Sequence, residues 1–408
     1  MIVSLIELIP LCIFGFFIGY LAMLSVLAAV HREGRCAEAA SQRRFAVIVP
    51  AHNEEITITR TLQSLRAIKY PENAFDVIVI ADNCSDGTAE LSRKLGAVVL
   101  ERCHPTLRGK GYALRWGFDL LLVKQPSYDG FVVIDADSIV SENFLSVMNC
   151  YLERGSQAIQ SSDLVAPKAG AWSSEITRLG FTLYNYVRPL GRRLIGCSAG
   201  IRGNGMCFSA STLRAVPWNA YSLTEDLEYG LLLLLNGITV DFAPEARVLA
   251  IMPVEAQNAQ SQRARWEGGR LPVIRAYAPR LLRFAVNKHS FKAFDACVEL
   301  MTPPFLLLFG VATIVAGCNV LLWQLGVQMI GPFVLPSIVL VFLAFVHVFI
   351  GLFAARADRS LYRALLFIPR YAVWKVLFYA NLARRRSDRG WIRTTREHVA
   401  LSERIKKS

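Results

Sequence analysis

Residues 301–355 contain no aspartate, glutamate, lysine or arginine. A helix that crosses a bilayer needs about 20 mainly apolar residues, so this segment is too long for one helix and predicts two, with a break near Gly331-Pro332. Residues 8–30 are also uncharged and predict a further span. A cleaved signal peptide is disfavoured there, because residues 1–7 include no basic residue and the apolar stretch is too long. The chain is therefore expected to cross a membrane three times.

The charge balance agrees with a membrane location. The chain has 45 basic and 32 acidic residues, a net charge of +13, while 53% of its residues are hydrophobic. Such an excess needs an anionic partner, which a lipid membrane surface, a phosphorylated substrate or a nucleic acid could supply. We expect no nucleic-acid partner, because the chain contains no recognition motif for one.

Basic residues flank the predicted spans. Arg43-Arg44 follow the first span, and residues 383–408 carry nine basic and three acidic residues. The positive-inside rule places both regions in the cytoplasm, which predicts a multi-pass protein of the cell inner (plasma) membrane. The apolar stretch 361–382 contains Arg363, Arg370 and Lys375, and a charge at the bilayer centre costs about 2.5–3.5 kcal/mol. We therefore expect a helix lying in the membrane interface, with a fourth span as the alternative.

The region between the spans has the pattern of an α/β domain. Short apolar runs at residues 45–49, 76–81, 97–100 and 131–134 predict strands. Helical patterns at about 55–65, 87–95 and 110–122 separate them. This alternation predicts βαβ units and a mostly parallel sheet. Ligands of such sheets bind beyond the carboxyl ends of the strands, so the residues that follow each run are the ones of interest.

Acidic residues follow three of these strands. Glu54 comes after Pro50 and the first run, Asp82 after the second, and Asp135 with Asp137 after the fourth. Each has an ordinary explanation as a turn or capping residue. Three such groups on one sheet edge would repel one another unless they served a cation or a polar ligand, so the pattern favours a binding site.

The Asp135-Ala136-Asp137 segment suits a hard divalent ion. Magnesium and manganese bind few protein oxygens and take their other ligands from substrate phosphates and water. Lys110 opens a predicted helix after Arg108-Gly109 and is a candidate for holding a diphosphate, although the spacing is not that of a Walker A loop and a solvated turn is the alternative.

Two further clusters complete the candidate site. Thr224 is a plausible helix N-cap, followed by Glu225 and Asp226, which either complement the helix dipole or provide a general base. Gln262 and Arg265 lie three residues apart on one predicted helical face. Arg265 could bind a phosphate, and the adjacent Trp266 could contact a sugar ring or anchor the chain at the membrane interface.

Together these motifs resemble the membrane-anchored family 2 glycosyltransferases, the group that includes cellulose, chitin, hyaluronan and poly-N-acetylglucosamine synthases. The resemblance covers about residues 45–301. The motifs occur in the order Val-Pro-Ala-His-Asn-Glu-Glu, Asp82, Asp135-Ala136-Asp137, Gly203-Asn204-Gly205-Met206, Thr224-Glu225-Asp226 and Gln262-x-x-Arg265-Trp266. Each motif is short, but all of them in this order form a specific signal.

The resemblance implies a fold and a division of the chain. The fold is a GT-A domain, a Rossmann-like α/β domain that binds nucleotide sugars, in the cytoplasm between N- and C-terminal membrane helices. The predicted segments are an anchor (1–30), a basic linker (31–44), the GT-A domain (45–270), an interfacial helical connection (271–300), two membrane helices (301–355), and an interfacial helix with a basic cytoplasmic tail (356–408).

The resemblance also implies roles for the site residues. Asp82 would contact the uridine of a UDP-sugar, within a donor site that includes Pro50, Glu54, Lys110 and Asp135. Asp135 and Asp137 would hold the diphosphate and its Mg²⁺ or Mn²⁺, Asp137 as the more direct ligand, and Asp226 would be the catalytic base. The acceptor and diphosphate site would comprise Glu225, Gln262, Arg265 and Trp266.

The implied activity is inverting, metal-dependent transfer from a UDP-sugar that forms a β-glycosidic bond. The acceptor would be a cell-surface polysaccharide or a polyprenyl-diphosphate-linked oligosaccharide, with polysaccharide export proteins as further partners. A processive synthase is the alternative, supported by Gln262-x-x-Arg265-Trp266, although three spans are few for a self-contained polymer channel. An inactive transport or assembly subunit is more remote, because Asp82, Asp135, Asp137 and Asp226 are all present.

Overall fold

The computed structural model describes residues 2–31, 41–123, 127–167, 172–251 and 256–371. Its head is built on one eight-stranded mixed sheet, in the order β3-β2-β1-β4-β7-β6-β8-β5. The strands are β1 (Phe45–Ala51), β2 (Phe75–Asp82), β3 (Val98–Arg102), β4 (Gly130–Val133), β5 (Ser138–Val140), β6 (Ala158–Val165), β7 (Met206–Ser209) and β8 (Val240–Ala250).

The first half of the sheet confirms the predicted βαβ pattern. Strands β3, β2, β1 and β4 are parallel, with Phe45 of β1 opposite both Phe75 and Gly130. The connecting helices are α2 (Ile58–Arg66), α3 (Thr88–Lys94) and α4 (Lys110–Leu121), at the predicted positions. Because the strands are parallel, their carboxyl ends meet at one edge, and β7 then joins β4 antiparallel and brings Met206 beside Val133.

Helices cover both faces of the sheet. The remaining helices of the head are α5 (Phe144–Glu153), α8 (Ala210–Ala215) and α9 (Glu225–Leu235), with a 3₁₀ turn at Glu72–Ala74. Alternate residues along each strand point to opposite faces. In β1, Ala46 and Ile48 join one hydrophobic cluster, while Phe45, Val47 and Val49 join the other. The sheet is therefore buried on both sides, as a mainly parallel sheet requires.

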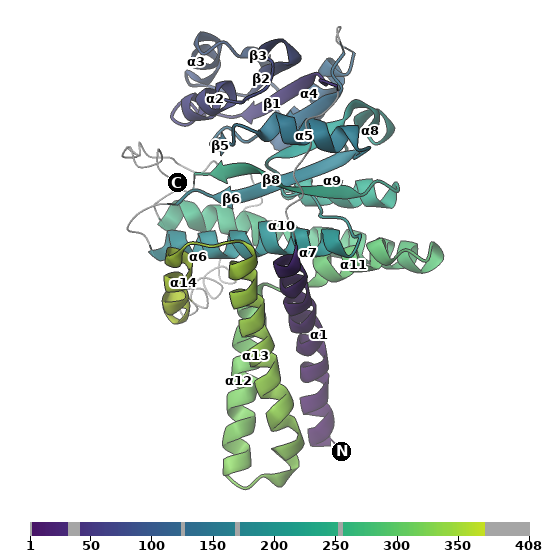
Figure 1. Cartoon of the computed structure of the whole chain (residues 1–408), viewed down its shortest axis with the longest axis vertical. Helices are drawn as coiled ribbons and strands as arrows, with labels where there is room; N and C mark the ends of the chain where they lie inside the picture. Colours follow the sequence, from purple (N-terminus) through teal and green to yellow (C-terminus); the bar gives the residue numbers. More distant parts are fainter. Residues whose placement is uncertain (1, 32–40, 124–126, 168–171, 252–255, 372–408) are drawn as a thin grey trace.

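A layer of helices lies between the sheet and the membrane helices (Figure 1). It consists of α6 (Trp172–Phe181), a π-helical segment (Thr182–Val187), α7 (Arg188–Leu194), α10 (Ala256–Asn287), α11 (Phe291–Met301) and α14 (Arg359–Ala364), which a 3₁₀ turn at Leu365–Phe367 follows. Residues 372–382, which make up half of the predicted interfacial helix, lie outside the described residues.

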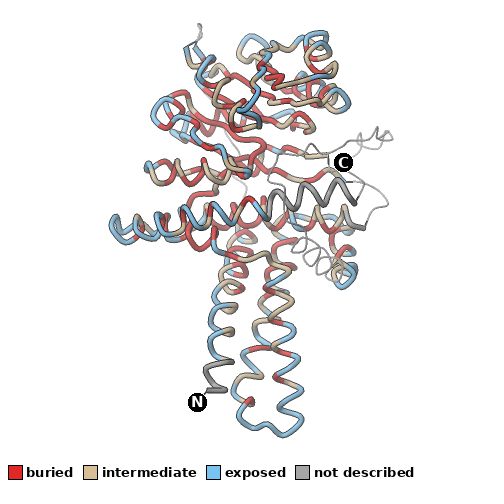
Figure 2. Tube along the Cα trace, turned by 180° about the vertical axis from the view of Figure 1, so that it is seen from behind, coloured by how far each residue is buried: buried red, intermediate tan, exposed pale blue. Residues whose placement is uncertain are grey.

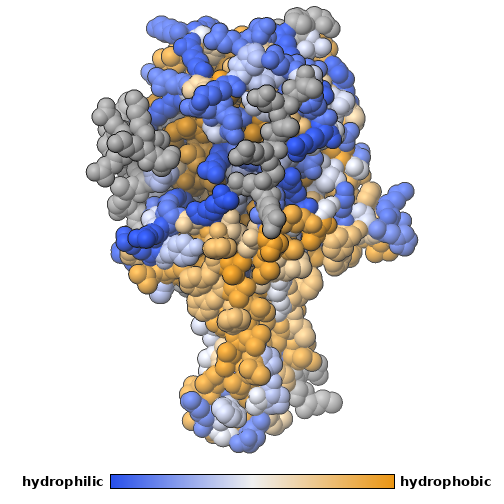
Figure 3. Space-filling model, viewed as in Figure 1, coloured by the Kyte–Doolittle hydropathy of each residue, from blue (hydrophilic) through white to orange (hydrophobic). Residues whose placement is uncertain are grey.

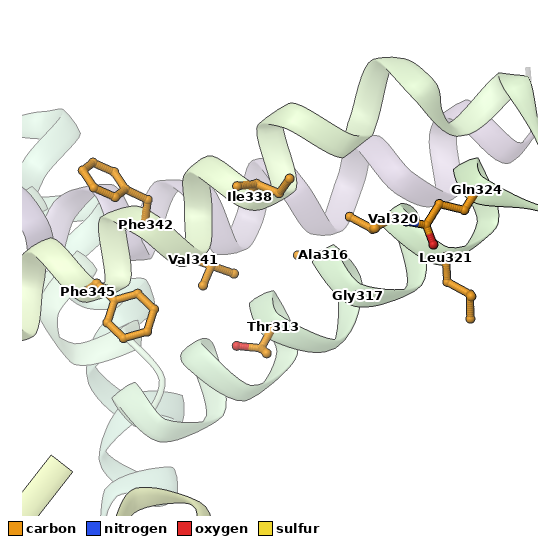
Figure 4. A pocket seen from close by; sticks show the side chains of 10 residues that line it. All are labelled: Thr313, Ala316, Gly317, Val320, Leu321, Gln324, Ile338, Val341, Phe342 and Phe345. Atoms are coloured by element: carbon orange, nitrogen blue, oxygen red, sulfur yellow. The ribbon is translucent and has the colours of Figure 1, made fainter. Parts of the chain in front are cut away.

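Three helices are long and apolar enough to cross a membrane, over Glu7–Val30, Phe305–Gln324 and Gln328–Ala354. They belong to α1 (Ile2–Val30), α12 (Phe305–Gln324) and α13 (Gly331–Ala354), the last preceded by a 3₁₀ turn at Gln328–Ile330. The predicted break is confirmed, since Gly331 is the first residue of α13. The three helices form a stalk with an apolar surface beneath a more polar head (Figure 3). A groove of about 690 Å³ runs between α12 and α13 and is lined mainly by apolar side chains, including those of Val320, Val341 and Phe345 (Figure 4).

The stalk and the head share one hydrophobic core. Val348 and Leu352 of α13 and Ala28 of α1 belong to the same cluster of buried residues as Ile78 and Phe131 of the sheet. Buried residues accordingly run without a break from the sheet into the upper ends of the membrane helices (Figure 2). The head is therefore not a separate body on a flexible tether.

Candidate active site

The loops after β1 and β2 are bound to each other. Asn53 Oδ1 accepts a hydrogen bond of 2.7 Å from the Ser85 amide, and Glu55 accepts one of 3.1 Å from the Gly87 amide. Both loops begin with an asparagine in the left-handed conformation, Asn53 at φ 55° and Asn83 at φ 52°. Asparagine tolerates this conformation better than most residues do. The Glu55 carboxylate therefore joins the two loops, and the Glu54 amide does so too by donating to Thr88 Oγ1 at 2.8 Å.

Asp82 lies at the end of β2, where the sequence predicted a residue that binds the UDP-sugar. Its carboxylate forms a 2.5 Å ion pair with Arg102 at the end of β3, and both side chains are only 8% exposed. Arg102 also donates to the carbonyl oxygen of Leu107. The pair fixes the carboxylate at the carboxyl edge of the sheet. Pro50, which was also predicted to line the UDP-sugar site, lies in β1 beside Ile80 of β2.

Lys110 is the centre of the second group of predicted residues. At the start of α4, its ammonium donates 2.5 Å hydrogen bonds to Asp135 Oδ1 and to the carbonyl oxygen of Gly203. Burial acts to lower the pKa of Lys110, but the charges of Asp135, Glu225 and Asp226 outweigh that effect and raise it. Lys110 is therefore a cation at neutral pH, placed among three carboxylates that the sequence analysis had assigned to one site.

Asp226 also lies close to Gly203. Gly203 has a φ of +86°, and a Cβ added to it would lie 2.9 Å from Asp226 Oδ2. Glu225 packs against the start of α4, since a Cβ on Gly111 would be 3.5 Å from the Glu225 Cβ. The two glycines therefore allow the first turn of α9 to approach the Lys110–Asp135 pair closely.

Thr224 differs in detail from its predicted role. It occupies the N-cap position of α9, but its side chain makes no capping hydrogen bond. The hydroxyl instead donates to the carbonyl oxygen of Gly269 in α10, at 3.3 Å. A Cβ on Gly269 would lie 3.0 Å from the Thr224 Cγ2. The predicted N-cap position is therefore confirmed, but the side chain does not cap the helix, because a tertiary contact to α10 takes the hydroxyl.

A buried cluster of polar side chains, Asn204, Asp163 and Asn185, holds the loop that carries Asp135. The Asn204 side chain accepts a hydrogen bond from the Asp135 amide at 3.0 Å and donates to Ser138 Oγ at 2.9 Å and to Asp163 Oδ1 at 3.2 Å. Asn185 donates to the other oxygen of Asp163 at 3.1 Å. Burial raises the pKa of the Asp163 carboxyl, and the charge of Asp135 raises it further.

Sequence reasoning missed Asp163 and Asn185 and gave Asn204 no role of its own. Asp163 lies within β6, in no recognisable motif. The only signal for it was the run of polar residues Gln160-Ser161-Ser162-Asp163 inside the predicted α/β domain.

Asp135 and Asp137 are the described residues that fit a divalent metal ion. Within the described ranges, no group of three or more His, Cys, Asp or Glu side chains is placed to hold one. Mg²⁺ commonly binds one or two protein carboxylates and completes its shell with substrate phosphates and water. Two carboxylates on one loop, with the Asp135 side chain 37% exposed, meet that requirement when a diphosphate is present.

The motif Gln262-x-x-Arg265-Trp266 falls in α10, but the side chains of these three residues lie outside the described part of the chain. Their predicted roles therefore remain predictions.

The mixed sheet, with carboxylates and a lysine gathered at the carboxyl ends of its strands, is that of a GT-A glycosyltransferase. Residues 42–269, more than half of the chain, match the family described as "Glycosyltransferase like family 2". The chain belongs to this family.

Named relatives and a solved structure agree with this assignment. The Bacillus subtilis protein named "Probable glycosyltransferase YdaM" is 26% identical over 277 residues, which are 66% of this chain and 64% of the relative. The poly-beta-1,6-N-acetyl-D-glucosamine synthase of Staphylococcus aureus is 28% identical over 240 residues, 56% of this chain and 55% of the relative. The chain thus spans less than two thirds of the length of either protein.

The solved mannosyltransferase PcManGT from Pyrobaculum calidifontis, in complex with GDP-Man and Mn²⁺, has a TM-score of 0.52 at 14% identity, covering 86% of this chain and 97% of that one. At this identity the likeness supports the fold alone.

Proposed function

We propose that this protein transfers a sugar from a UDP-sugar to a hydroxyl group, with inversion at the anomeric carbon, and forms a β-glycosidic bond. The observation that carries the proposal is the arrangement around Gly203. Its carbonyl oxygen accepts from Lys110, which also pairs with Asp135, and a Cβ added to it would lie 2.9 Å from Asp226 Oδ2. A cation for a leaving diphosphate and a carboxylate for an attacking hydroxyl are thus both close to one residue.

The proposed reaction needs no covalent enzyme intermediate. Asp226 accepts the proton of the acceptor hydroxyl, and that oxygen bonds to the anomeric carbon as the bond from this carbon to the UDP phosphate oxygen breaks. Lys110 offsets the negative charge that develops on UDP, a contribution that such preorganised cations make in dry sites. A Mg²⁺ or Mn²⁺ held by Asp135 and Asp137 would supply further positive charge to the diphosphate.

The proposed acceptor is a cell-surface polysaccharide or a polyprenyl-diphosphate-linked oligosaccharide, and the head is placed in the cytoplasm. Three apolar helices and the basic segments that flank them support this location. Polysaccharide export proteins are the further partners that this role would require.

The test measures transfer by the full-length protein in detergent or native membranes. Labelled UDP-glucose, UDP-N-acetylglucosamine and GDP-mannose are offered with Mg²⁺ or Mn²⁺, and the products are sized. We expect Asp226→Asn to bind UDP-sugar but to lose transfer, since it cannot accept the proton. Asp119→Asn, which removes an exposed carboxylate paired with Arg115 in α4, is the control and should retain activity. Normal turnover by the Asp226→Asn protein would contradict the assignment of the base.

A processive polysaccharide synthase is the second candidate. The match to poly-beta-1,6-N-acetyl-D-glucosamine synthase favours it. In the same assay a long polymer, absent with Asp226→Asn, would support processive synthesis. A lipid-extractable product one sugar longer than its acceptor would support a single addition.

A further inference from the structure

Four arginines lie together where the head meets the membrane helices. This junction cluster consists of Arg188 and Arg192 of α7, Arg202 of the loop before β7, and Arg270 of α10, with the two carboxylates of α11, Asp295 and Glu299. All four arginines lower the pKa of the Glu299 carboxyl. Burial alone would raise this pKa, but the positive charges hold it at about 2. The cluster belongs to the helical layer beneath the sheet (Figure 1).

One half of the cluster is well compensated. Arg192 forms a 2.7 Å ion pair with Asp295, and both side chains are at most 3% exposed. The hydroxyl of Tyr20 in α1 donates to the other oxygen of Asp295 at 2.8 Å. This part joins α7, α11 and the first membrane helix and is balanced in charge.

The other half carries more positive than negative charge. Arg202 and Arg188 share the single carboxylate of Glu299, at the long distances of 3.4 and 3.7 Å. Arg270 donates to the carbonyl oxygens of Glu299, Leu300 and Thr302 at the end of α11. A helix C-terminus carries about half a negative charge. This half therefore keeps an excess of more than one positive charge within the described part of the chain.

Burial makes that excess costly. The side chains of Arg188 and Arg202 are each 5% exposed, and a buried charge is expensive unless it is paired and hydrogen-bonded. The Nε atoms of Arg188, Arg202 and Arg270 are buried and have no hydrogen-bond partner. Both Arg188 and Arg202 lie over the ring of Tyr184, at 4.9 and 4.2 Å from its centroid, which compensates them only in part. Glu299 Oε2 is also buried without a partner, so three such donors face one such acceptor, and the surplus of donors suits an anion.

The position of the cluster indicates which anion. Arg202 directly precedes Gly203, the residue between Lys110 and Asp226. Thr302, whose carbonyl accepts from Arg270, lies three residues before α12 enters the membrane segment. An anion bound here would thus lie between the bilayer and the candidate active site. Guanidinium groups bind the oxygens of phosphate and carboxylate groups in a fork, and the anion that a bilayer surface offers is the phosphate group of its lipids.

We infer that the Arg188–Arg202–Arg270 side of the junction cluster binds the phosphate group of a membrane lipid. The phosphate could belong to a polyprenyl-linked acceptor or to a bulk anionic phospholipid. Only the first source rests on the proposed function, because phosphate binding itself does not require transfer.

The test uses full-length protein purified in a neutral detergent and stripped of lipid. Binding of a polyprenyl phosphate is compared with that of the uncharged polyprenol and of phosphatidylglycerol, by native mass spectrometry and by titration. We expect Arg188→Gln to weaken binding of the phosphate about tenfold to a hundredfold, the loss of one charged hydrogen-bond donor. Arg188→Gln should still fold, because Arg202 then has Glu299 to itself and Arg192 keeps Asp295.

Two matched variants distinguish a phosphate site from a purely structural ion cluster. Arg178→Gln removes a partly buried arginine of the same helical layer that is paired with Glu175 and Asp358, and it should leave lipid binding unchanged. Glu299→Gln increases the positive excess and should bind the phosphate at least as tightly as the natural protein. A structural cluster would instead lose stability in Arg188→Gln and in Glu299→Gln with no change in lipid affinity.

The outcomes separate the lipid sources from each other and from the proposed function. If the protein binds polyprenyl phosphate more tightly than phosphatidylglycerol and loses this preference in Arg188→Gln, the phosphate is that of the acceptor. If binding of both lipids depends equally on Arg188, the phosphate is that of a bulk phospholipid. Equal binding of polyprenol, or an unchanged affinity in Arg188→Gln, would overturn the inference. UDP-sugar binding is measured on the same samples, so a protein that binds the lipid but no nucleotide sugar would refute the proposed function and leave this site standing.

Discussion

Replacing Gly203 with alanine should impair transfer far more than it impairs folding. Gly203 has a φ of +86°, and an alanine held in that conformation costs about 1–2 kcal/mol. The added Cβ would also meet Asp226 Oδ2 at 2.9 Å, whereas ordinary contacts begin at 3.4 Å, so the carboxylate must retreat by the difference, about 0.5 Å. Because this oxygen is the end of a flexible side chain, the movement costs little stability. A displaced catalytic group, however, loses rate steeply, by about a hundredfold per ångström.

Gly237→Ala is the matched control. Gly237 follows the other end of α9, has a φ of +80°, and has no atom within 4 Å of an added Cβ. Both variants should therefore lose about 1–2 kcal/mol of stability, but only Gly203→Ala should lose about tenfold or more in kcat. The assay is initial-rate transfer at saturating donor, with resistance to proteolysis as the measure of folding. Equal kcat values for the two variants would refute the view that the position of Asp226 limits the reaction.

Three further predictions concern the support of the site, its metal and its pH dependence. Asn204→Ala should abolish most activity and lower the free energy of unfolding by about 2–3 kcal/mol, because it leaves the Asp135 amide without its acceptor and removes a hydrogen-bond partner of Asp163. Asn149→Ala is the control, since it removes a buried side-chain amide that makes two hydrogen bonds far from the site. It should lose similar stability and keep its activity. Chelation should abolish transfer, and added Mg²⁺ or Mn²⁺ should restore it; full activity in excess chelator would exclude the metal. Burial alone would raise the pKa of Glu299, but the surrounding arginines hold it at about 2, below the ordinary 4.5. Its stabilising contribution is therefore present above about pH 4.5 and is lost as the pH falls towards 2, so acid unfolding over this interval should be shallower in Glu299→Gln.

The sequence predicted the part of the fold in which local pattern and function coincide. Strands β1, β2 and β4 are continuous apolar runs, and the polar residues just after them had to meet at one edge once the strands were parallel. The grouping of Asp135 with Asp226 followed from the order of the motifs, and Lys110 was a candidate for the same site because it opens a predicted helix. Their individual roles stay predictions, as do those of Gln262, Arg265 and Trp266.

What the sequence could not predict depends on contacts between distant segments. Asp163 occupies a core position of β6, and only its tertiary neighbours Asn185 and Asn204 make a carboxyl there acceptable. The junction cluster joins α7 to α11, more than 90 residues apart in the chain, as the separation of 103 residues between Arg192 and Asp295 illustrates. Thr224 fits the rule for a capping residue, but α10 competes for its hydroxyl.

The packing of α1 against α13 has a consequence for how the protein is made. Ser25 of α1 bonds to His347 of α13 across 322 residues of chain, and a Cβ on Gly351 would meet both Ser25 and Leu183 of the head. At about 5–20 residues per second, a ribosome needs roughly 15 to 60 s to deliver the second helix after the first. During that interval the newly made head has no cover for the surface around Leu183. The final docking step must therefore wait for α13, and a fragment limited to residues 42–269 would carry that apolar surface exposed and is expected to aggregate.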